Sequence, residues 1–185
     1  MKNKTLIKVA LSGLIIVALA IFWAFPKEKT EAKTVIYQAP EITKVKSLCQ
    51  SKEQVIWNCT TTKNKIASVC ASKVVTDEKG YVQYRFGTSG KIELELPKSQ
   101  TNSQNFFRYS RYTRPLVTML TLTFENNGFS YEIHDDDNSE EKPPIRAASI
   151  DVTNGDKSSS ITCRQPVSGS LMKLETVVPK NEDGF

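Results

Sequence analysis

Apolar and polar residues alternate in short segments from residue 48 onward, and turn-forming residues separate these segments. Residues 81–86 and 92–96 show the alternation most clearly, with Gly-Thr-Ser-Gly at 87–90 between them. Because successive side chains of a β-strand point to opposite faces, this pattern predicts an antiparallel hairpin. Its apolar positions would form a buried face, and its charged positions would form a wet face.

Further segments have the character of strands. They are residues 55–59, 66–70, 116–124, 148–153 and 159–163. The strongest turn signal is Asn127-Gly128, because these residues readily adopt the positive φ angles of a two-residue hairpin turn. The strand that returns from this turn is predicted to bury Phe129, Tyr131 and Ile133.

The remaining segments complete an all-β pattern. Residues 135–144 are acidic and end in two prolines, so they predict a loop, and residues 171–178 are interpreted as one more strand or a short helix. Outside the first 25 residues, no window shows the helical period of about 3.6 residues. About eight or nine short strands at hairpin spacing predict an antiparallel sandwich or barrel behind one N-terminal apolar helix.

The first 25 residues carry the signal for export. Three lysines precede an apolar run that extends from Val9 to Phe25, and such a segment directs export with its positive end in the cytoplasm. Residues 18–20 (Ala-Leu-Ala) have the form of a signal-peptide cleavage site. The apolar run continues past this site, however, which favours an uncleaved anchor that spans the membrane through residues 6–25.

The sequence divides into four parts. Residues 1–25 are the signal peptide or membrane anchor, 26–47 a polar tether rich in lysine and glutamate, 48–178 the β domain and 179–185 a flexible tail. We expect a periplasmic protein, either soluble after cleavage or anchored in the inner membrane. Three of the 25 basic residues and none of the 20 acidic ones lie in the leader, so the exported part contains 22 basic and 20 acidic residues. A near-neutral exported domain excludes nucleic acid as a partner.

Four cysteines follow the leader, and in an exported chain they predict structural disulfides. They are Cys49, Cys59, Cys70 and Cys163. A bond between Cys59 and Cys70 across their hairpin is one possibility. The favoured pattern joins Cys163 to Cys59 or Cys70, with Cys49 taking the other. The absence of a Cys-x-x-Cys motif and the presence of only one histidine argue against zinc.

The residues around these cysteines carry a resemblance. Cys59 is followed by Lys-Ile-Ala-Ser-Val-Cys-Ala-Ser at 65–72, by Tyr-Val-Gln-Tyr-Arg-Phe-Gly at 81–87 and by Ile-Glu-Leu-Glu-Leu-Pro at 92–97. This combination resembles a group of small exported proteins of Gram-negative bacteria, and the similarity covers most of residues 55–165. The resemblance implies a β fold and a periplasm-facing location, and it implies no activity.

The chain offers little for catalysis or metal binding. Its single histidine, His134, precedes three aspartates, but there is no nucleophile elbow, so we expect no catalytic residues, no cofactor and no enzymatic activity. Asp135, Asp137 and Glu141 are the only candidate metal ligands. Their segment lacks the central glycine and distant glutamate of a calcium loop, which favours a solvated acidic loop over a calcium site.

Residues 105–114 contain three arginines and four aromatic residues, a combination that is typical of protein-binding surfaces. The candidate partner-binding residues are Arg108, Tyr109, Arg111, Tyr112 and Arg114 from this stretch, together with Arg85 from between two aromatics. In the alternative interpretation the aromatics belong to the core, and the arginines cover its rim with their aliphatic stems.

These features together predict a non-catalytic envelope protein with a protein partner in the periplasm. We expect it to bind and block that partner, either as an inhibitor or as an immunity protein against a toxin delivered to the periplasm. A rigid, disulfide-held β domain suits this role because it loses little entropy on binding. The alternative is an envelope module that binds a glycan, a lipid headgroup or a cation.

Overall fold

The computed structural model describes residues 46–182, which contain nine β-strands and two short 3₁₀ helices. The elements are β1 (Glu53–Thr61), β2 (Ile66–Ser72), β3 (Val82–Thr88), β4 (Lys91–Leu96), η1 (Ser103–Phe106), β5 (Arg108–Arg114), β6 (Val117–Asn126), β7 (Phe129–Asn138), β8 (Ile145–Asn154), β9 (Lys157–Gly169) and η2 (Leu171–Leu174). The predicted all-β class is confirmed. The predicted N-terminal helix and most of the tether lie outside the described residues.

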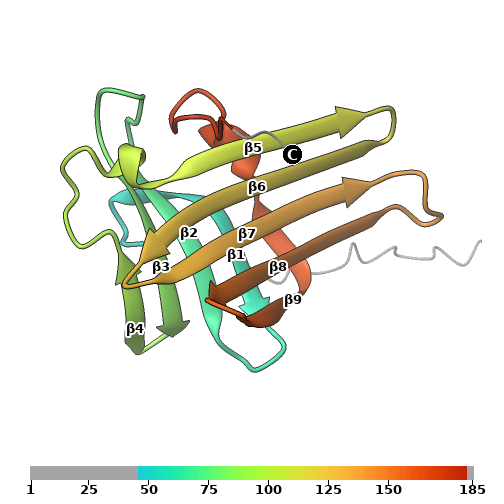
Figure 1. The fold of residues 1–185 in the computed structure, drawn as a ribbon, viewed down its shortest axis with the longest axis horizontal. Coiled ribbons are helices and arrows are strands. Elements are labelled where there is room, and N and C mark those ends of the chain that lie inside the picture. Colours follow the sequence, from blue (N-terminus) through green and yellow to red (C-terminus); the bar gives the residue numbers. More distant parts are fainter. Residues whose placement is uncertain (1–45, 183–185) are drawn as a thin grey trace, which may run out of the picture. The chain divides into compact units, whose positions relative to one another are not determined.

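The nine antiparallel strands form a single sheet in the order β4-β3-β2-β1-β9-β8-β7-β6-β5. This sheet curls into a half-barrel with two arms, β1–β4 and β5–β8, and β5–β8 cross in front of β1–β4 in Figure 1. Strand β9 belongs to both arms, since residues up to Thr162 pair with β8 and residues from Cys163 pair with β1. Strands that pass between sheets through irregular positions are the usual way to build such a corner.

The core lies between the two arms. Rings from opposite arms meet where Tyr84 on β3 lies 5.1 Å from Phe124 on β6, measured between ring centroids. Helix η2 contacts both β1 and β6, and it buries Leu171 and Leu174 completely. The segment that was predicted to be a strand or a short helix therefore begins with a short helix, which fills the space between the arms.

The junction of β9 with β1 depends on one glycine. Gly169 has φ +77°, a left-handed conformation that favours glycine, and a Cβ atom at this position would collide with the carbonyl oxygen of Ile56. The close approach lets Ser170 N–H donate to the same Ile56 carbonyl at 2.8 Å. Any residue other than glycine would therefore strain the turn from β9 into η2.

Two disulfides stabilise the half-barrel. Cys59–Cys163 joins β1 to β9 at the corner of the sheet, and Cys49–Cys70 attaches the segment before β1 to β2. This connectivity is one of the two alternatives that the sequence favoured. Two disulfides indicate a non-reducing environment outside the cytoplasm. Among residues 46–182, the structure contains no helix that is both long enough and apolar enough to cross a membrane.

Three local predictions were wrong. Strand β7 continues to Asn138, so the first part of the predicted acidic loop is a strand, because β6 and β8 both offer it backbone partners. Phe129 is 41% exposed because it lies at the rim of the sheet, beyond the core. Residues 179–181 are not a free tail: Tyr109 N–H donates to the Pro179 carbonyl, and Asn181 N–H donates to the Tyr109 carbonyl, both at 2.9 Å.

Candidate protein-binding surface

Arg85, one of the predicted partner-binding residues, is completely buried and therefore offers nothing to a partner. Its guanidinium group donates to Glu53 at 2.6 and 3.0 Å, to Glu95 at 2.7 Å and to Gln83 at 2.8 Å. Alternation correctly places Arg85 on the polar face of β3. That face is not wet, because the segment around Leu48 covers it, and the Leu48 carbonyl accepts a further bond from Arg85.

Glu53 is the counter-ion that makes this burial possible, and its side chain is also fully buried. Burial alone would raise the pKa of Glu53, but hydrogen bonds from Arg85, the Gln50 backbone and Tyr81 outweigh it and lower the pKa. The Glu53 carboxylate is therefore charged at neutral pH and paired with a buried cation. This ion pair is structural.

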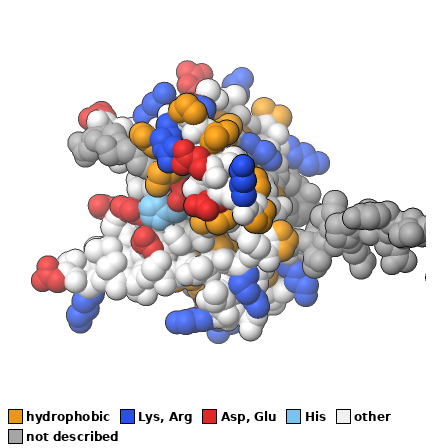
Figure 2. All heavy atoms as spheres, turned by 90° about the vertical axis from the view of Figure 1, so that its right-hand side faces the viewer, with side chains coloured by type: hydrophobic (Ala, Val, Ile, Leu, Met, Phe, Trp, Pro, Cys, Tyr) orange, Lys and Arg blue, Asp and Glu red, His pale blue; other side chains and the backbone are white. Residues whose placement is uncertain are grey.

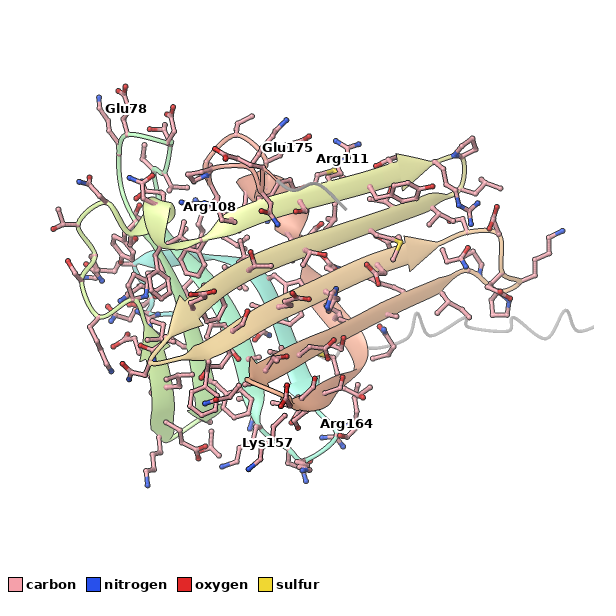
Figure 3. All side chains as sticks on the ribbon, in the orientation of Figure 1. Glu78, Arg108, Arg111, Lys157, Arg164 and Glu175 are labelled. Atoms are coloured by element: carbon pink, nitrogen blue, oxygen red, sulfur yellow. A yellow bond between two sulfur atoms is a disulfide. The ribbon has the colours of Figure 1, made fainter. Side chains whose placement is uncertain are left out.

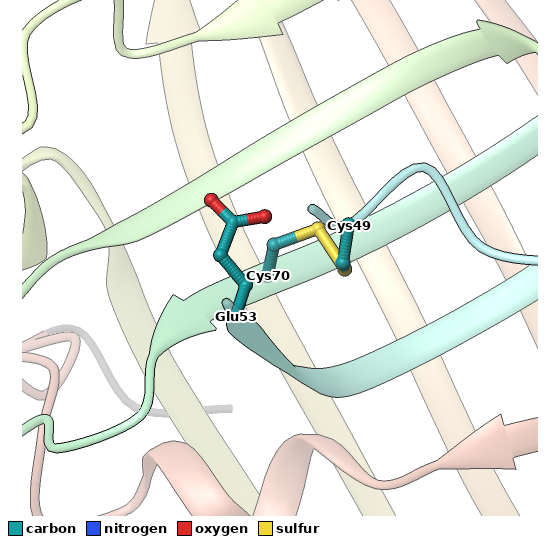
Figure 4. Close-up of side chains that lie close together, drawn as sticks. All are labelled: Cys49, Glu53 and Cys70. Carbon is teal, nitrogen blue, oxygen red and sulfur yellow. A yellow bond between two sulfur atoms is a disulfide. The ribbon is translucent and has the colours of Figure 1, made fainter. Parts of the chain in front are cut away.

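The same region contains the one cluster of potential metal ligands in the described part of the chain, Cys49, Glu53 and Cys70. Figure 4 shows the disulfide between the two cysteines beside the Glu53 carboxylate. The two sulfur atoms form a disulfide, and the carboxylate accepts hydrogen bonds from Arg85, so none of the three groups is free to bind a metal. The role of this cluster is therefore structural: it holds the segment before β1 against β2 and β3.

Tyr109 is also buried, with only 1% of its surface exposed, so it contributes to the core and not to an exposed surface. Phe107 is buried beside it on the same face of the chain. Burial raises the pKa of Tyr109 to about 12, and its hydroxyl has no hydrogen-bond partner within residues 46–182. For these two aromatics, the alternative interpretation as core residues is the correct one.

The other four predicted residues lie at the surface of β5. Arg108 donates to the carbonyls of Asn105 and Phe107, at 2.9 and 2.8 Å. Arg111 pairs with Glu175 at 2.9 Å, and Arg114 pairs with Glu140 at 2.7 Å. Figure 3 shows Arg108 and Arg111 along β5, with Glu175 beside Arg111. Tyr112 is 42% exposed, so the structure places three arginines and one aromatic on this edge strand.

The far end of the β5–β8 arm exposes large apolar side chains. We call the set Tyr112, Leu116, Met119 and Ile145 the apolar tip; their exposed fractions range from 37% to 64%. Tyr112 and Met119 are direct cross-strand partners on the outer face of the arm. Apart from Tyr112, these residues were not predicted from the sequence, because alternation shows which face a residue lies on and not whether that face is covered.

Asp136 lies in the same cross-strand row of the outer face, between Met119 on β6 and Ala147 on β8. Its Oδ1 atom is buried and has no hydrogen-bond partner in the described structure. Burial raises the pKa of Asp136, against the opposing effect of nearby His134. A desolvated carboxylate beside exposed apolar side chains is costly for an isolated domain, and a cationic partner group would relieve this cost.

His134 lies further along the outer face, in a group of acidic residues that Figure 2 shows around the histidine. Its ring nitrogens lie 3.4 Å from Thr121 Oγ1, 3.4 Å from Asp151 and 3.6 Å from Glu132. This resembles a hydroxyl–imidazole–carboxylate series. Strands β6, β7 and β8 use their backbone N–H groups in the sheet, however, so the strands around His134 supply no donors for an oxyanion.

The three candidate metal ligands do not converge. Asp135 is buried and accepts hydrogen bonds from Arg146 at 2.6 and 2.9 Å and from the Leu171 backbone at 3.1 Å. Asp137 lies 4.0 Å from the same guanidinium, and Glu141 is exposed in the loop after β7. The cation that these aspartates hold is therefore Arg146.

No protein-family model, curated protein or solved structure matches this chain. The resemblance to exported proteins of Gram-negative bacteria therefore stays a prediction. We infer function from the surface of the chain itself, where the apolar tip and the exposed Arg114 of β5 are adjacent.

Proposed function

We propose that this protein is a non-catalytic envelope protein that binds and blocks another protein, as an inhibitor or as an immunity protein against a periplasm-delivered toxin. It would act in the periplasm, either free or held at the inner membrane by residues 6–25. The apolar tip, with Arg114 and Asp136 beside it, is the surface that we assign to the partner.

One residue carries this proposal. Leu116 is 64% exposed and has φ +65°, a conformation that costs a bulky residue about 1–2 kcal/mol and that glycine or asparagine adopts readily. It follows Pro115 in the turn between β5 and β6. An exposed leucine in a strained turn stabilises neither the core nor the turn, so the side chain is best explained by a contact outside the domain.

The surroundings of Leu116 support a protein partner. Apolar side chains at the centre of a patch with charged groups at its rim are the usual anatomy of protein interfaces. One charged group is Arg114, whose ion pair with Glu140 is exposed to solvent. The other is Asp136, whose Oδ1 atom is buried without a hydrogen-bond partner in the described structure. Two disulfides hold the neighbouring β1–β4 arm and its junction with β9, and a rigid domain limits the entropy that binding costs.

The test is affinity capture with the oxidised full-length protein, from envelope extracts and culture supernatant of its source organism. We expect one partner, bound at equal stoichiometry, whose activity falls in proportion to the protein added. Leu116→Asn and Met119→Glu should abolish capture, and Leu116→Asn should leave the unfolding midpoint unchanged or raise it. Ile92→Glu, on the exposed edge of β4, is the matched control and should capture normally. Capture that survives both tip variants would refute this assignment.

The alternative, a ligand-binding module, has one observation in its favour. An open cleft of about 500 Å³ lies at the rim of the half-barrel, lined by Phe129, Val152, Asn154 and Lys157 among others. Mouths of curled β-sheets are common ligand sites. A rise in unfolding temperature with glycan fragments, phospholipid headgroups or calcium, lost in Phe129→Ser, would favour this function instead.

A further inference from the structure

Strand β5 forms one edge of the sheet, and only part of its free edge is covered. Residues 179–181 run alongside it in the parallel direction and form a single bridge, between Tyr109 and Lys180. Both backbone groups of Tyr109 are bonded there, to Pro179 and Asn181. The edge of β5 therefore already accepts an added strand at its first half.

The second half of this edge is open. Because Pro115 and Leu116 form a two-residue turn, Arg114 pairs with Val117, and backbone groups alternate in direction along β5 from that point. The N–H and C=O groups of Arg111 and Thr113 consequently point away from β6, as those of Tyr109 do. Within residues 46–182 they have no hydrogen-bond partner.

A groove of about 270 Å³ runs along this open edge. It is lined by Tyr109, Arg111, Thr113, Glu175 and Lys180. Arg111 holds one side of it, with Nε donating to Thr113 Oγ1 at 3.0 Å and Nη1 paired to Glu175 at 2.9 Å. Two cationic side chains against one carboxylate make the groove complementary to an acidic ligand.

We propose that the partner inserts an extended acidic segment into this groove as an additional strand on β5. Its backbone would bond to Arg111 and Thr113, and one of its carboxylates would compete with Glu175 for the Arg111 guanidinium. Strand addition of this kind takes affinity from main-chain hydrogen bonds and specificity from the flanking side chains. The inference rests on the proposed function, and it names the chemistry of the partner.

The competing explanation is protective. Charged side chains on an edge strand prevent unwanted pairing with other chains, and Arg111 and Arg114 could serve that purpose alone. The two explanations differ in what they predict for a backbone N–H group. A protective edge has no use for the Thr113 N–H, whereas an added strand needs it.

The experiment selects a displayed library of random short peptides against the oxidised full-length protein. Enrichment of acidic peptides is expected. Thr113→Pro removes the edge N–H and should weaken their binding roughly tenfold or more, whereas Thr113→Ala keeps that N–H and should bind as before. Proline is tolerated at this position because the N–H is not part of the ladder with β6.

Arg111→Gln is the second variant, and it should weaken the preference for acidic peptides while changing the unfolding midpoint little, because the half-exposed pair with Glu175 contributes little stability. No enrichment, or binding that survives Thr113→Pro, would overturn the proposal. Failure of the two proposals can be told apart. A captured partner that binds Thr113→Pro normally would leave the proposed function standing without strand addition. Acidic peptides that bind this edge, with no protein captured, would leave strand addition standing without the proposed function.

Discussion

Replacing Arg85 with methionine should destabilise the domain severely, because the change leaves Glu53 as an uncompensated buried charge. The guanidinium group of Arg85 donates two bonds to Glu53, one to Glu95 and one to Gln83, and neither the Arg85 nor the Glu53 side chain is exposed. Breaking a buried ion pair by removing one partner costs about 3–5 kcal/mol. A domain of this size has a total stability of about 5–15 kcal/mol.

The assay is equilibrium urea unfolding of the oxidised protein at pH 7. Arg114→Met is the matched control, since it removes the same kind of side chain from an exposed pair, and its midpoint should not move. Replacing Arg85 and Glu53 together with methionine should restore much of the loss, because the buried charge is then absent. If Arg85→Met unfolds at the same urea concentration as Arg114→Met, the buried pair does not hold this region together.

The pH dependence gives an independent check of the same reasoning. The pKa of Glu53 is lowered in the folded state, so the pair contributes stability above pH 4.5, the ordinary pKa of the group, and this contribution is lost as pH falls through the folded pKa. In Arg85→Met, burial without the cation should instead raise the pKa of Glu53. The difference in unfolding free energy between the unsubstituted protein and Arg85→Met should therefore become smaller in acid. A difference in unfolding free energy that stays constant between pH 7 and acid would refute this account.

Three further predictions can be checked by the same unfolding assay. Gly169→Ala should lower the free energy of unfolding by about 2 kcal/mol, because alanine disfavours φ +77° and its Cβ would collide with the Ile56 carbonyl. Gly90→Ala, which has open space around it, should change this free energy little. Equal unfolding midpoints for the two variants would contradict this account. Removing the disulfide that closes 104 residues should lower the free energy of unfolding by about 1.4 kcal/mol more than removing the one that closes 21. The reverse order would contradict the loop argument. The raised pKa of Asp136 means that its charge opposes folding at neutral pH and ceases to do so as pH falls through the folded pKa. Asp136→Asn should accordingly raise the midpoint at pH 7 and lose this gain in acid, and a gain that persists in acid would contradict the account.

Local sequence signals predicted most of the strands. Alternation located β3 and β4, and Asn127-Gly128 located the turn between β6 and β7, where both residues have positive φ angles. These predictions succeed because a strand's period of two and a turn's φ requirement depend on neighbouring residues only. The cysteines and the leader likewise predicted disulfides, and the structure contains two.

Burial of individual polar residues could not be predicted in the same way. Alternation places Arg85 on the polar face of its strand, and only the segment around Leu48, attached by its disulfide, turns that face into the interior. Asp135 is similar, because Arg146 on the neighbouring strand and the η2 backbone satisfy it. The partners of both residues come from other elements of the fold, so their burial depends on how those elements pack.

The candidate surface shows the same division. The sequence by itself marked residues 105–114 as rich in arginine and tyrosine, and four of the six predicted contact residues are exposed. The tertiary structure alone decided that Tyr109 points into the core, that β5 is an edge strand, and that Leu116, Met119 and Ile145 are left uncovered at one end of an arm. Periodicity fixes which residues share a face, because it is a property of the local backbone. Which faces and edges are covered depends on long-range packing, because the covering residues are distant in sequence.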